Sequence, residues 1–390
     1  MLLLPLTHTL SQAQFNTTHH LLKSTSARSA ARFRRQLSLP LSPGSDYTLS
    51  FNLGHQAQPI TLYMDTGSDL VWLPCAPFKC ILCEGKPNAS PPANITRSVA
   101  VSCKSLACSA AHNLAPSSDL CAMALAGFGR GLLSLPAQLA TLSPQLGNRF
   151  SYCLVSHSFD SERVQKSSPL ILGRYEEKEK EKISGGGMVE FAYTPMLENP
   201  KHPYFYLVSL IGISVGKRNI PAPEMLQRVN HRGDGGVVVD SGTTFTMLPE
   251  AFYNSVVDEF DRRVGRVNQR ARKIEEKTGL APCYYLNAVA EVPVMTLRFA
   301  GGNSSVVLPR KNYFYEFLDG SDETKGKKRV GCLMLMNGGD ERELSGGPGA
   351  TLGNYQQQGF EVVYDLVEKR VGFAKRHCAS LWDRLNRDKN

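Results

Sequence analysis

The sequence lacks any apolar run that approaches the roughly 18 residues of a membrane-spanning helix, so it predicts no membrane span. Its 390 residues allow for about two domains with sizeable cores. A hydrophobic content of 42% and a charged content of 20% are typical of an ordinary globular protein.

Acidic residues are absent from the first 45 positions, which contain five Lys or Arg. The opening "MLLLPL" is shorter than the ~7–15-residue apolar core of a secretory signal. Two interpretations stay open: a plastid transit peptide, or a basic prosegment behind a signal whose first residues are not in this chain. We expect residues 1–44 to be such a targeting segment or prosegment, largely disordered.

The cysteine-rich stretch lacks the ligand pattern of a usual zinc site. Six of the ten cysteines lie within 75–121, spaced C-x4-C-x2-C and then C-x4-C-x12-C, and no histidine completes a usual ligand set. The pattern favours disulfides over a metal, and no cofactor is predicted. Disulfides favour a secreted protein over a plastid one. Four Asn-x-Ser/Thr sequons agree with secretion and are candidate glycosylation sites: Asn16, Asn88, Asn94 and Asn303.

The net charge of +9 is not gathered into one basic run. Basic residues cluster at the N-terminus, at 262–273 and at 325–329, and acidic residues flank the middle cluster. A helix is expected over about 249–263, so the middle cluster is interpreted as solvated surface that continues from it. We therefore predict no nucleic-acid partner.

One sequence pattern occurs twice. Residues 62–74 are "LYMDTGSDLVWLP" and residues 237–249 are "VVVDSGTTFTMLP", and the two superimpose at a constant offset of 175 positions. In each copy an apolar strand runs into an Asp, a hydroxyl residue, a Gly and a second hydroxyl residue. Short strands with few helices fill the rest, which predicts a mainly β protein in two related halves.

Two such loops, packed about a pseudo-twofold axis, would bring Asp65 and Asp240 together. Two adjacent carboxyl groups in a low-dielectric site cannot both ionise, so they titrate as a pair that holds one proton over an acidic range. The ionised partner can take a proton from water while the protonated partner gives one to a carbonyl oxygen. This is general acid–base hydrolysis of an amide bond.

The residues after each Asp have expected supporting roles. The two glycines let the turns tighten and direct backbone N–H groups at the carboxylates. The hydroxyls directly after each Asp can link the loops, and those three positions after each Asp can bind the outer carboxylate oxygens. These supporting residues are Thr66, Gly67, Ser68, Ser241, Gly242 and Thr243.

These motifs resemble the pepsin-like aspartic proteases, most closely their plant nepenthesin-like branch. The resemblance covers about residues 45–378 and includes "DTGSDLVWLPC", "DSGTTFTMLP" and a glycine signature after each, ending at Gly127 and Gly353. The paired titration above is known behaviour of this family. The resemblance implies a bilobal fold with lobes at 45–195 and 196–380, a monomer, and polypeptide substrates.

The first lobe departs from the family pattern. Asp65 to Gly127 spans 62 positions, whereas Asp240 to Gly353 spans 113. The family has a β-hairpin flap in this interval, with a tyrosine that hydrogen-bonds the tryptophan matched by Trp72. No tyrosine occurs between Tyr63 and Tyr152. We interpret this as a truncated N-terminal lobe whose flap region is missing near 121–125, with a naturally compact flap as the alternative.

Function is predicted on that basis. The first interpretation is an aspartic-type endopeptidase acting at acid pH through Asp65 and Asp240, secreted to the cell wall or vacuole, with its activity impaired by the missing flap. The alternative is a non-catalytic binding or inhibitor protein of the same fold. Retention of both Asp residues favours the enzyme, and loss of the flap favours the alternative.

The resemblance also implies a disulfide pattern. We expect an incomplete set, because the family partners of Cys83 and Cys103 would lie in the missing segment. The expected pairs are Cys75–Cys80, Cys108–Cys121, Cys153–Cys378 and Cys283–Cys332.

Overall fold

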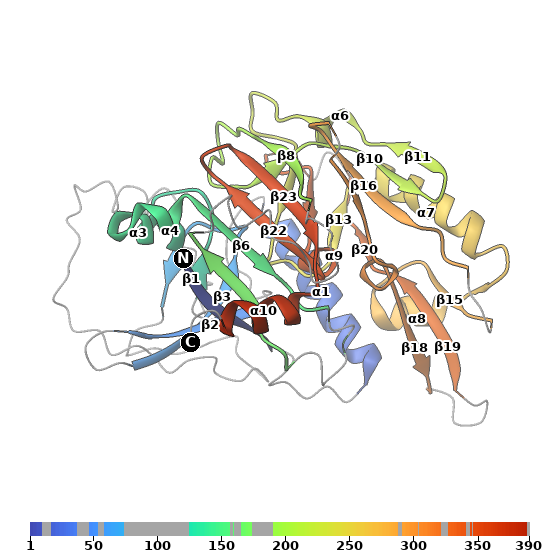
Figure 1. Ribbon diagram of the computed structural model, residues 1–390. Helices are drawn as coiled ribbons and strands as arrows, with labels where there is room; N and C mark the ends of the chain where they lie inside the picture. Colours follow the sequence, from blue (N-terminus) through green and yellow to red (C-terminus); the bar gives the residue numbers. More distant parts are fainter. Residues whose placement is uncertain are drawn as a thin grey trace.

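Strands dominate the computed structural model of the chain (Figure 1). The structure describes residues 1–9, 17–36, 47–53, 58–73, 125–156, 159, 165–173, 190–287, 291–302, 304–320, 327–340, 344 and 346–387. Within these ranges the strands form one large sheet of 15 strands and two smaller sheets of four strands each. The fold is mainly β with a few short helices, as predicted.

The large sheet runs through the middle of the molecule and reaches into both sides of it (Figure 1). Its strands, in spatial order, are β20 (Leu335–Asn337), β13 (Thr246–Leu248), β21 (Ala350–Leu352), β12 (Val237–Val239), β9 (Leu207–Val208), β8 (Ala192–Leu197), β23 (Arg370–Lys375), β22 (Phe360–Asp365), β6 (Arg149–Cys153), β7 (Ser168–Leu172), β1 (Leu2–His8), β2 (Tyr47–Leu53), β3 (Gln58–Asp65), β5 (Leu125–Gly127) and β4 (Val71–Trp72).

The smaller sheets lie in the C-terminal half. One has the order β11 (Arg218–Pro221), β10 (Leu210–Val215), β16 (Met295–Phe299), β17 (Ser305–Val307), and the other β14 (Gln269–Arg270), β15 (Cys283–Tyr285), β19 (Lys328–Leu333), β18 (Phe314–Asp319). The helices are α1 (Thr18–Gln36), α3 (Leu135–Leu142), α4 (Pro144–Gly147), α6 (Glu224–Gln227), α7 (Glu250–Val264), α8 (Arg272–Thr278), α9 (Asn354–Gln357), α10 (Cys378–Arg387) and the 3-10 turn η3 (Arg310–Asn312).

Helix α7 shows why the sequence forms a helix where one was expected. Pro249 stands at its N-cap, and the apolar residues Phe252, Val256 and Phe260 recur at four-residue intervals. All three are buried, so one face of α7 packs on the core. The basic residues at its end, Arg262 and Arg263, both bind the buried carboxylate of Glu259.

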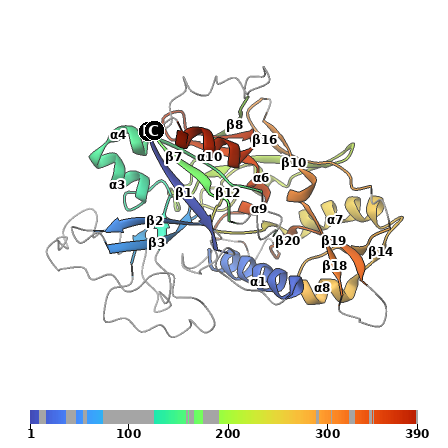
Figure 2. The ribbon, with the colours of Figure 1, turned by 60° about the horizontal axis from the view of Figure 1, so that its bottom comes forward.

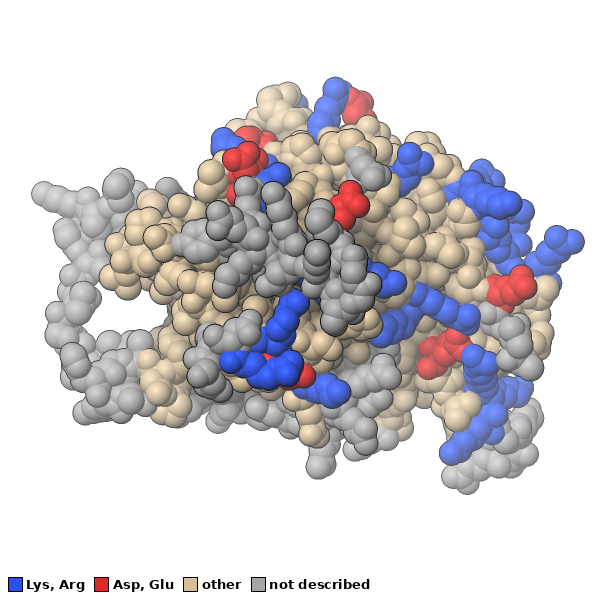
Figure 3. Space-filling model, in the orientation of Figure 1, with Lys and Arg blue, Asp and Glu red and all other residues tan. Residues whose placement is uncertain are grey.

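Basic side chains form several separate groups on the face drawn in Figure 3, with acidic side chains among them. Some basic residues share an acidic partner, as Arg310 and Arg329 share Glu316. Part of the positive charge is therefore paired locally.

Each half contains the same arrangement of three strands. In the first, β3 pairs parallel with β5 and β4 pairs antiparallel with β5. In the second, β12 pairs parallel with β21 and β13 pairs antiparallel with β21. The second half adds β20 outside β13, whereas β4 is the last strand of the first half within the described residues. The repeated sequence pattern is therefore also a repeated topology.

The N-terminal segment is ordered where the structure describes it, and the expectation of a largely disordered 1–44 is wrong for these residues. Residues 2–6 of β1 pair with β7, and Thr7 and His8 pair with β2. Helix α1 packs against α8, and Leu22 is fully buried there. This order was not predicted, because both elements depend on partners far along the chain.

His8 makes the docking of β1 sensitive to acid. Burial, together with the nearby charge of Arg28, lowers the pKa of His8 from 6.5 to about 3. The folded state therefore keeps His8 neutral, whereas an undocked His8 gains a proton below pH 6.5. Because docking requires the neutral ring, its free energy should weaken by about 2 kcal/mol between pH 7 and pH 5. The equilibrium constant for undocking of β1 should then rise about thirtyfold.

Hydrogen exchange of the β1 amides, corrected for intrinsic rates, measures this opening. In the parent, protection should fall about thirtyfold from pH 7 to pH 5, and His8→Leu should remove most of that fall. His20→Leu, at an exposed position of α1, is the control and should behave like the parent. An equal fall in the His8→Leu and parent proteins would contradict the assignment.

Candidate active site

The ends of β3 and β12 bring Asp65 and Asp240 together in the interior. Both residues are fully buried. A Cβ atom added to Gly67 would lie 2.7 Å from the carboxylate of Asp240, and one added to Gly242 would lie 2.3 Å from Oδ1 of Asp65. Each glycine therefore faces the carboxylate of the opposite loop, and no larger residue fits at either position. Their N–H groups bind the carboxylate of their own loop, at 3.0 and 2.7 Å.

The hydroxyls directly after each Asp link the two loops. The backbone N–H of Ser241 donates to Thr66 Oγ1 at 2.8 Å, and that of Thr66 donates to Ser241 Oγ at 3.1 Å. The hydroxyls in turn donate to backbone carbonyls across the interface, Thr66 to Val239 and Ser241 to Met64. This reciprocal pair of hydrogen bonds fixes the separation of the two loops at the residues that directly follow each Asp.

The second pair of hydroxyls is asymmetric. Thr243 donates to Oδ2 of Asp240 at 2.6 Å, as expected. Ser68 was expected to do the same at Asp65, but within the described residues neither its hydroxyl nor Asp65 Oδ2 has a hydrogen-bond partner. Asp65 instead uses Oδ1, which accepts from Gly67 and from a side chain outside both loops.

That side chain is Arg32 of α1. Its Nη2 lies 2.6 Å from Asp65 Oδ1, and its Nε lies 3.2 Å from Asp240 Oδ2 and 3.1 Å from Thr243 Oγ1. Only 4% of the Arg32 side chain is exposed. One guanidinium therefore bridges both carboxyl groups, at the place where a water molecule would have to lie for hydrolysis.

The two carboxyl groups differ in proton affinity. Burial raises the pKa of Asp65 to about 6, even though the charge of Arg32 opposes the shift. At Asp240 burial also favours the neutral form, but the charge of Arg32, the Thr243 hydroxyl and the Gly242 N–H outweigh it, so its pKa is lowered. Asp240 is therefore the ionised member of the pair, and Asp65 is the member that takes up a proton at acid pH.

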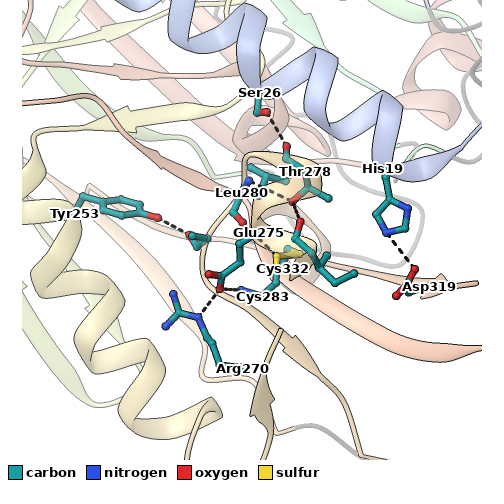
Figure 4. Close-up of a disulfide and its surroundings, with 12 residues drawn as sticks. His19, Ser26, Tyr253, Arg270, Glu275, Thr278, Leu280, Cys283, Asp319 and Cys332 are labelled. Atoms are coloured by element: carbon teal, nitrogen blue, oxygen red, sulfur yellow. Dashed lines mark hydrogen bonds and ion pairs between the residues drawn. A yellow bond between two sulfur atoms is a disulfide. The ribbon is translucent and has the colours of Figure 1, made fainter. Parts of the chain in front are cut away.

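Helix α1 is held against the C-terminal half. The Ser26 hydroxyl donates to the carbonyl of Thr278 at 2.8 Å, and Ser29 Oγ accepts the N–H of Phe245 at 3.3 Å. Figure 4 shows the Ser26 contact and the contact of His19 with Asp319, at 3.4 Å, beside the disulfide of the same lobe. Figure 2 shows α1 lying along this side of the molecule beside α8, which the N-terminal half of α1 contacts.

The structure also places some of the other predicted site residues. It joins Cys153 to Cys378, with an S–S distance of 2.07 Å, and Cys283 to Cys332, with 1.98 Å, the pairs that the resemblance implies. Other predicted features lie outside what the structure describes: the Trp72 side chain, Cys75, Cys80, Cys83, Cys103, Cys108, Cys121, Asn16, Asn88, Asn94 and Asn303. Among the described residues no group of three His, Cys, Asp or Glu side chains could hold a metal ion.

Sequence reasoning missed Asp69, which follows the first catalytic-type loop. It is 8% exposed, and its Oδ1 accepts the N–H of Gly131 at 2.5 Å. Burial raises its pKa to about 7, although the Gly131 N–H opposes the shift. The adjacent N–H groups of Gly129 and Arg130 bind the carbonyls of Ser68 and Tyr204. Asp69 thus belongs to a junction between the first loop and the start of the C-terminal half.

Comparison with known proteins agrees with the fold and the motifs. Residues 47–124 match the family model of the xylanase inhibitor N-terminal domain, and residues 205–375 match that of the C-terminal domain. A probable aspartyl protease of Arabidopsis thaliana is 54% identical over 470 positions, which cover 98% of this chain and 94% of the relative. Nepenthesin-1, an aspartic proteinase of Nepenthes gracilis, is 26% identical over 86% of this chain and 78% of its own length.

Solved structures show the same fold at low identity. The structure of edgp superimposes with a TM-score of 0.64 at 17% identity, over 87% of this chain and 94% of that chain. Basic 7S globulin from soybean gives a TM-score of 0.62 at 16% identity, over 88% and 96%. The chain belongs to the plant pepsin-like aspartyl protease family. No helix among the described residues is long and apolar enough to cross a membrane.

The alignment with the Arabidopsis relative that is 54% identical also shows that this chain is shorter than the aligned region. The alignment with the Arabidopsis protease has 470 positions, but this chain has 390 residues, so at least 80 positions (470 − 390) are without a residue here. The match to the N-terminal family model ends at residue 124, directly before β5.

Asp69 should make the protein more stable in acid than at neutral pH. Because its folded-state pKa is raised from 3.8 to about 7, the protonated form stabilises the fold. That contribution is complete below about pH 4 and is lost as the pH rises towards 7. Asp69→Asn, which cannot ionise but can still accept from Gly131, should stabilise the protein at pH 7.5 by about 4 kcal/mol relative to the parent.

Denaturant unfolding at pH 5 and pH 7.5 measures this difference. The parent should lose stability between the two values of pH, and Asp69→Asn should lose about 2 kcal/mol less. Asp258→Asn, at an exposed position of α7, is the control and should follow the parent. The same pH dependence in Asp69→Asn and in the parent would rule out this role.

Proposed function

We propose that the protein is an aspartic-type endopeptidase that hydrolyses polypeptides at acid pH, and that its N-terminal segment keeps it in a blocked precursor state. The observation that carries this proposal is the Arg32 guanidinium bound between Asp65 and Asp240. The close approach of Gly67 and Gly242 to the opposite carboxylates supports a proton-sharing pair, and the family relationship supports the reaction type. In this proposal Asp240 activates the water and Asp65 protonates the substrate carbonyl oxygen.

Acid pH has opposite effects on the two parts of the molecule, which supports a precursor. Protonation of His8 weakens the docking of β1, while protonation of Asp69 stabilises the junction beside the first loop. Protonation of Asp65 also removes one of the two carboxylates that hold Arg32. A fall in pH thus loosens the N-terminal segment and leaves the body of the protein intact.

The proposal includes secretion and low activity of this particular chain. The disulfides Cys153–Cys378 and Cys283–Cys332 suit an oxidising compartment. The alignment positions without a residue, and the family match that ends at residue 124, support a segment missing between Cys121 and Leu125. Without the flap that closes over substrate in this family, turnover is expected to be slower than in the longer relatives.

A non-catalytic binding protein is the second candidate. The same missing segment favours it, and so do the matches to the xylanase inhibitor family models. Retention of both carboxyl groups and both linking hydroxyls favours the enzyme, because a binding protein has no need of them. Turnover after release of α1 distinguishes the two candidates.

The first test removes the carboxyl groups one at a time. After acid treatment of the full chain, Asp65→Asn and Asp240→Asn should each lower the hydrolysis of a denatured protein at pH 4 at least about a hundredfold, because an amide cannot exchange the required protons. The exposed Asp258→Asn is the control and should keep the parental rate. Turnover that survives either Asn substitution would refute the mechanism. Absence of turnover in the parent, together with tight binding of a statine-type inhibitor, would favour the binding protein.

The second test concerns the block. Arg32→Gln removes the two charge-assisted hydrogen bonds to Asp65 and Asp240, worth about 1.5–3 kcal/mol. The intact chain should therefore turn over substrate at least about tenfold faster than the parent before any proteolysis. Initial rates at pH 6, where the N-terminal segment of the parent is still docked, with chain length verified by mass spectrometry, measure this effect.

Two matched variants control for changes in charge and in the helix. Arg32→Lys keeps the positive charge and should stay close to the parental rate. Lys23→Gln removes an exposed charge from the same helix and should also leave the rate unchanged. If Arg32→Gln were no faster than Lys23→Gln, Arg32 would not be the blocking group.

A further inference from the structure

A buried polar cluster lies beneath the two Asp loops, on the side of the central sheet. It consists of Tyr152 of β6, Tyr364 of β22 and Gln357 of α9. The two tyrosines are fully buried and Gln357 is 2% exposed. Strands β6 and β22 pair in the middle of the large sheet, which both halves of the molecule share (Figure 1).

The hydrogen bonds of the cluster form a chain with a defined direction. The Tyr152 hydroxyl donates to Oε1 of Gln357, so its oxygen is left to accept from Tyr364, at 2.8 Å. Gln357 Nε2 donates to the carbonyl of Leu352 at 2.8 Å and contacts the carbonyl of Asp240 at 3.4 Å. The chain therefore ends on the backbone of one Asp and of the strand beneath it.

The other end of the chain lies against the first loop. The Tyr364 hydroxyl lies 3.3 Å from the carbonyl of Val239 and 3.5 Å from Thr66 Oγ1. Its one proton goes to Tyr152, so these are packing contacts, and Thr66 itself binds Val239 and accepts from Ser241. The cluster thus packs against the linking hydroxyl of the first loop at one end and contacts the backbone of Asp240 at the other.

Packing alone does not account for these polar groups. Phe150 stacks on the Tyr364 ring with centroids 4.7 Å apart, so an apolar ring is tolerated in this core. Tyr206 packs on the same ring, with centroids 4.4 Å apart, yet within the described residues its hydroxyl has no hydrogen-bond partner. A hydroxyl taken out of water is costly unless it is paired, so the two paired hydroxyls hold a specific geometry.

We propose that Tyr364, Tyr152 and Gln357 are positioning residues for the Asp65–Asp240 pair. They support the two loops from the side of the central sheet and set their separation. This maintains the proton sharing on which the proposed hydrolysis depends. This inference rests on the proposed function for its catalytic consequence but not for its geometric one. Small changes in the distance between reacting groups are costly for catalysis. Loss of one hydroxyl should therefore change the pKa values of the two carboxyl groups.

The experiment titrates the two carboxyl groups directly in the full chain. Carbon-13 NMR of labelled Asp side chains, assigned with Asp65→Asn and Asp240→Asn, gives the two apparent pKa values of the pair. Tyr364→Phe and Tyr152→Phe should each move at least one of these values by about half a unit. Tyr206 packs beside Tyr364, but its hydroxyl has no hydrogen-bond partner within the described residues. Tyr206→Phe is therefore the matched control and should leave both pKa values unchanged.

The double variant Tyr152→Phe/Tyr364→Phe tests whether the two hydroxyls act together through one chain of hydrogen bonds or act independently. If the hydroxyls act in series, the double variant should shift the titration no further than the larger single shift. Additive shifts would show two independent sites. Unchanged titration in Tyr364→Phe, or equal shifts in Tyr364→Phe and Tyr206→Phe, would overturn the proposal.

Kinetics provide the second measurement. If the acid-treated parent turns over substrate, Tyr364→Phe should lower kcat about tenfold with KM within about twofold, because the cluster contacts the loops and not the peptide. A change in KM alone would contradict a positioning role. Absence of turnover in the parent would count against the proposed function only, because the titration of the full chain still decides the role of the cluster.

Discussion

One guanidinium held between two buried carboxyl groups explains the placement of the N-terminal segment. Arg32 brings a charge into a site where only 4% of its side chain remains exposed, and such burial is costly unless each charge is paired. Asp65 and Asp240 supply that pairing, and the apolar contacts of Leu22 and Phe33 supply the remaining stabilisation of α1. Removing one member of such a buried ion pair leaves the other charges unpaired, so Arg32 fixes where α1 docks and its loss should weaken that docking.

The same interaction connects the chemistry of the site to pH. A guanidinium stays charged throughout the range in which proteins fold, so only its partners and its supports can titrate. The buried carboxyl of Asp65 and the buried ring of His8 both take up protons on acidification, and both changes weaken the hold on the N-terminal segment. Asp69 takes up a proton over a similar range with the opposite effect on the fold. A fall in pH therefore weakens the docking of the N-terminal segment but stabilises the junction at Asp69 in the rest of the molecule.

The sequence predicted the parts of the site that repeat. The 175-residue offset identified both loops, and the structure shows the linking hydroxyls and the close approach of both glycines. It also predicted helix α7, whose apolar residues recur at helical spacing. It did not predict Arg32 or the order of β1 and α1, because Arg32 depends in part on Asp240 and β1 in part on β7, both more than 150 positions away. Nor did it predict the cluster of Tyr152, Tyr364 and Gln357, whose members carry no motif and meet only when β6 and β22 pair.

The central claim is that the carboxyl pair is intact and is blocked by the protein's own N-terminal segment. Calorimetric titration of a statine-type inhibitor into the full chain tests it most directly, because the inhibitor hydroxyl binds where Arg32 lies. At pH 7 the account predicts no binding, and at pH 4 it predicts binding of one inhibitor per chain without any cleavage of the protein. Binding of equal strength at both values of pH, or at neither, would contradict it.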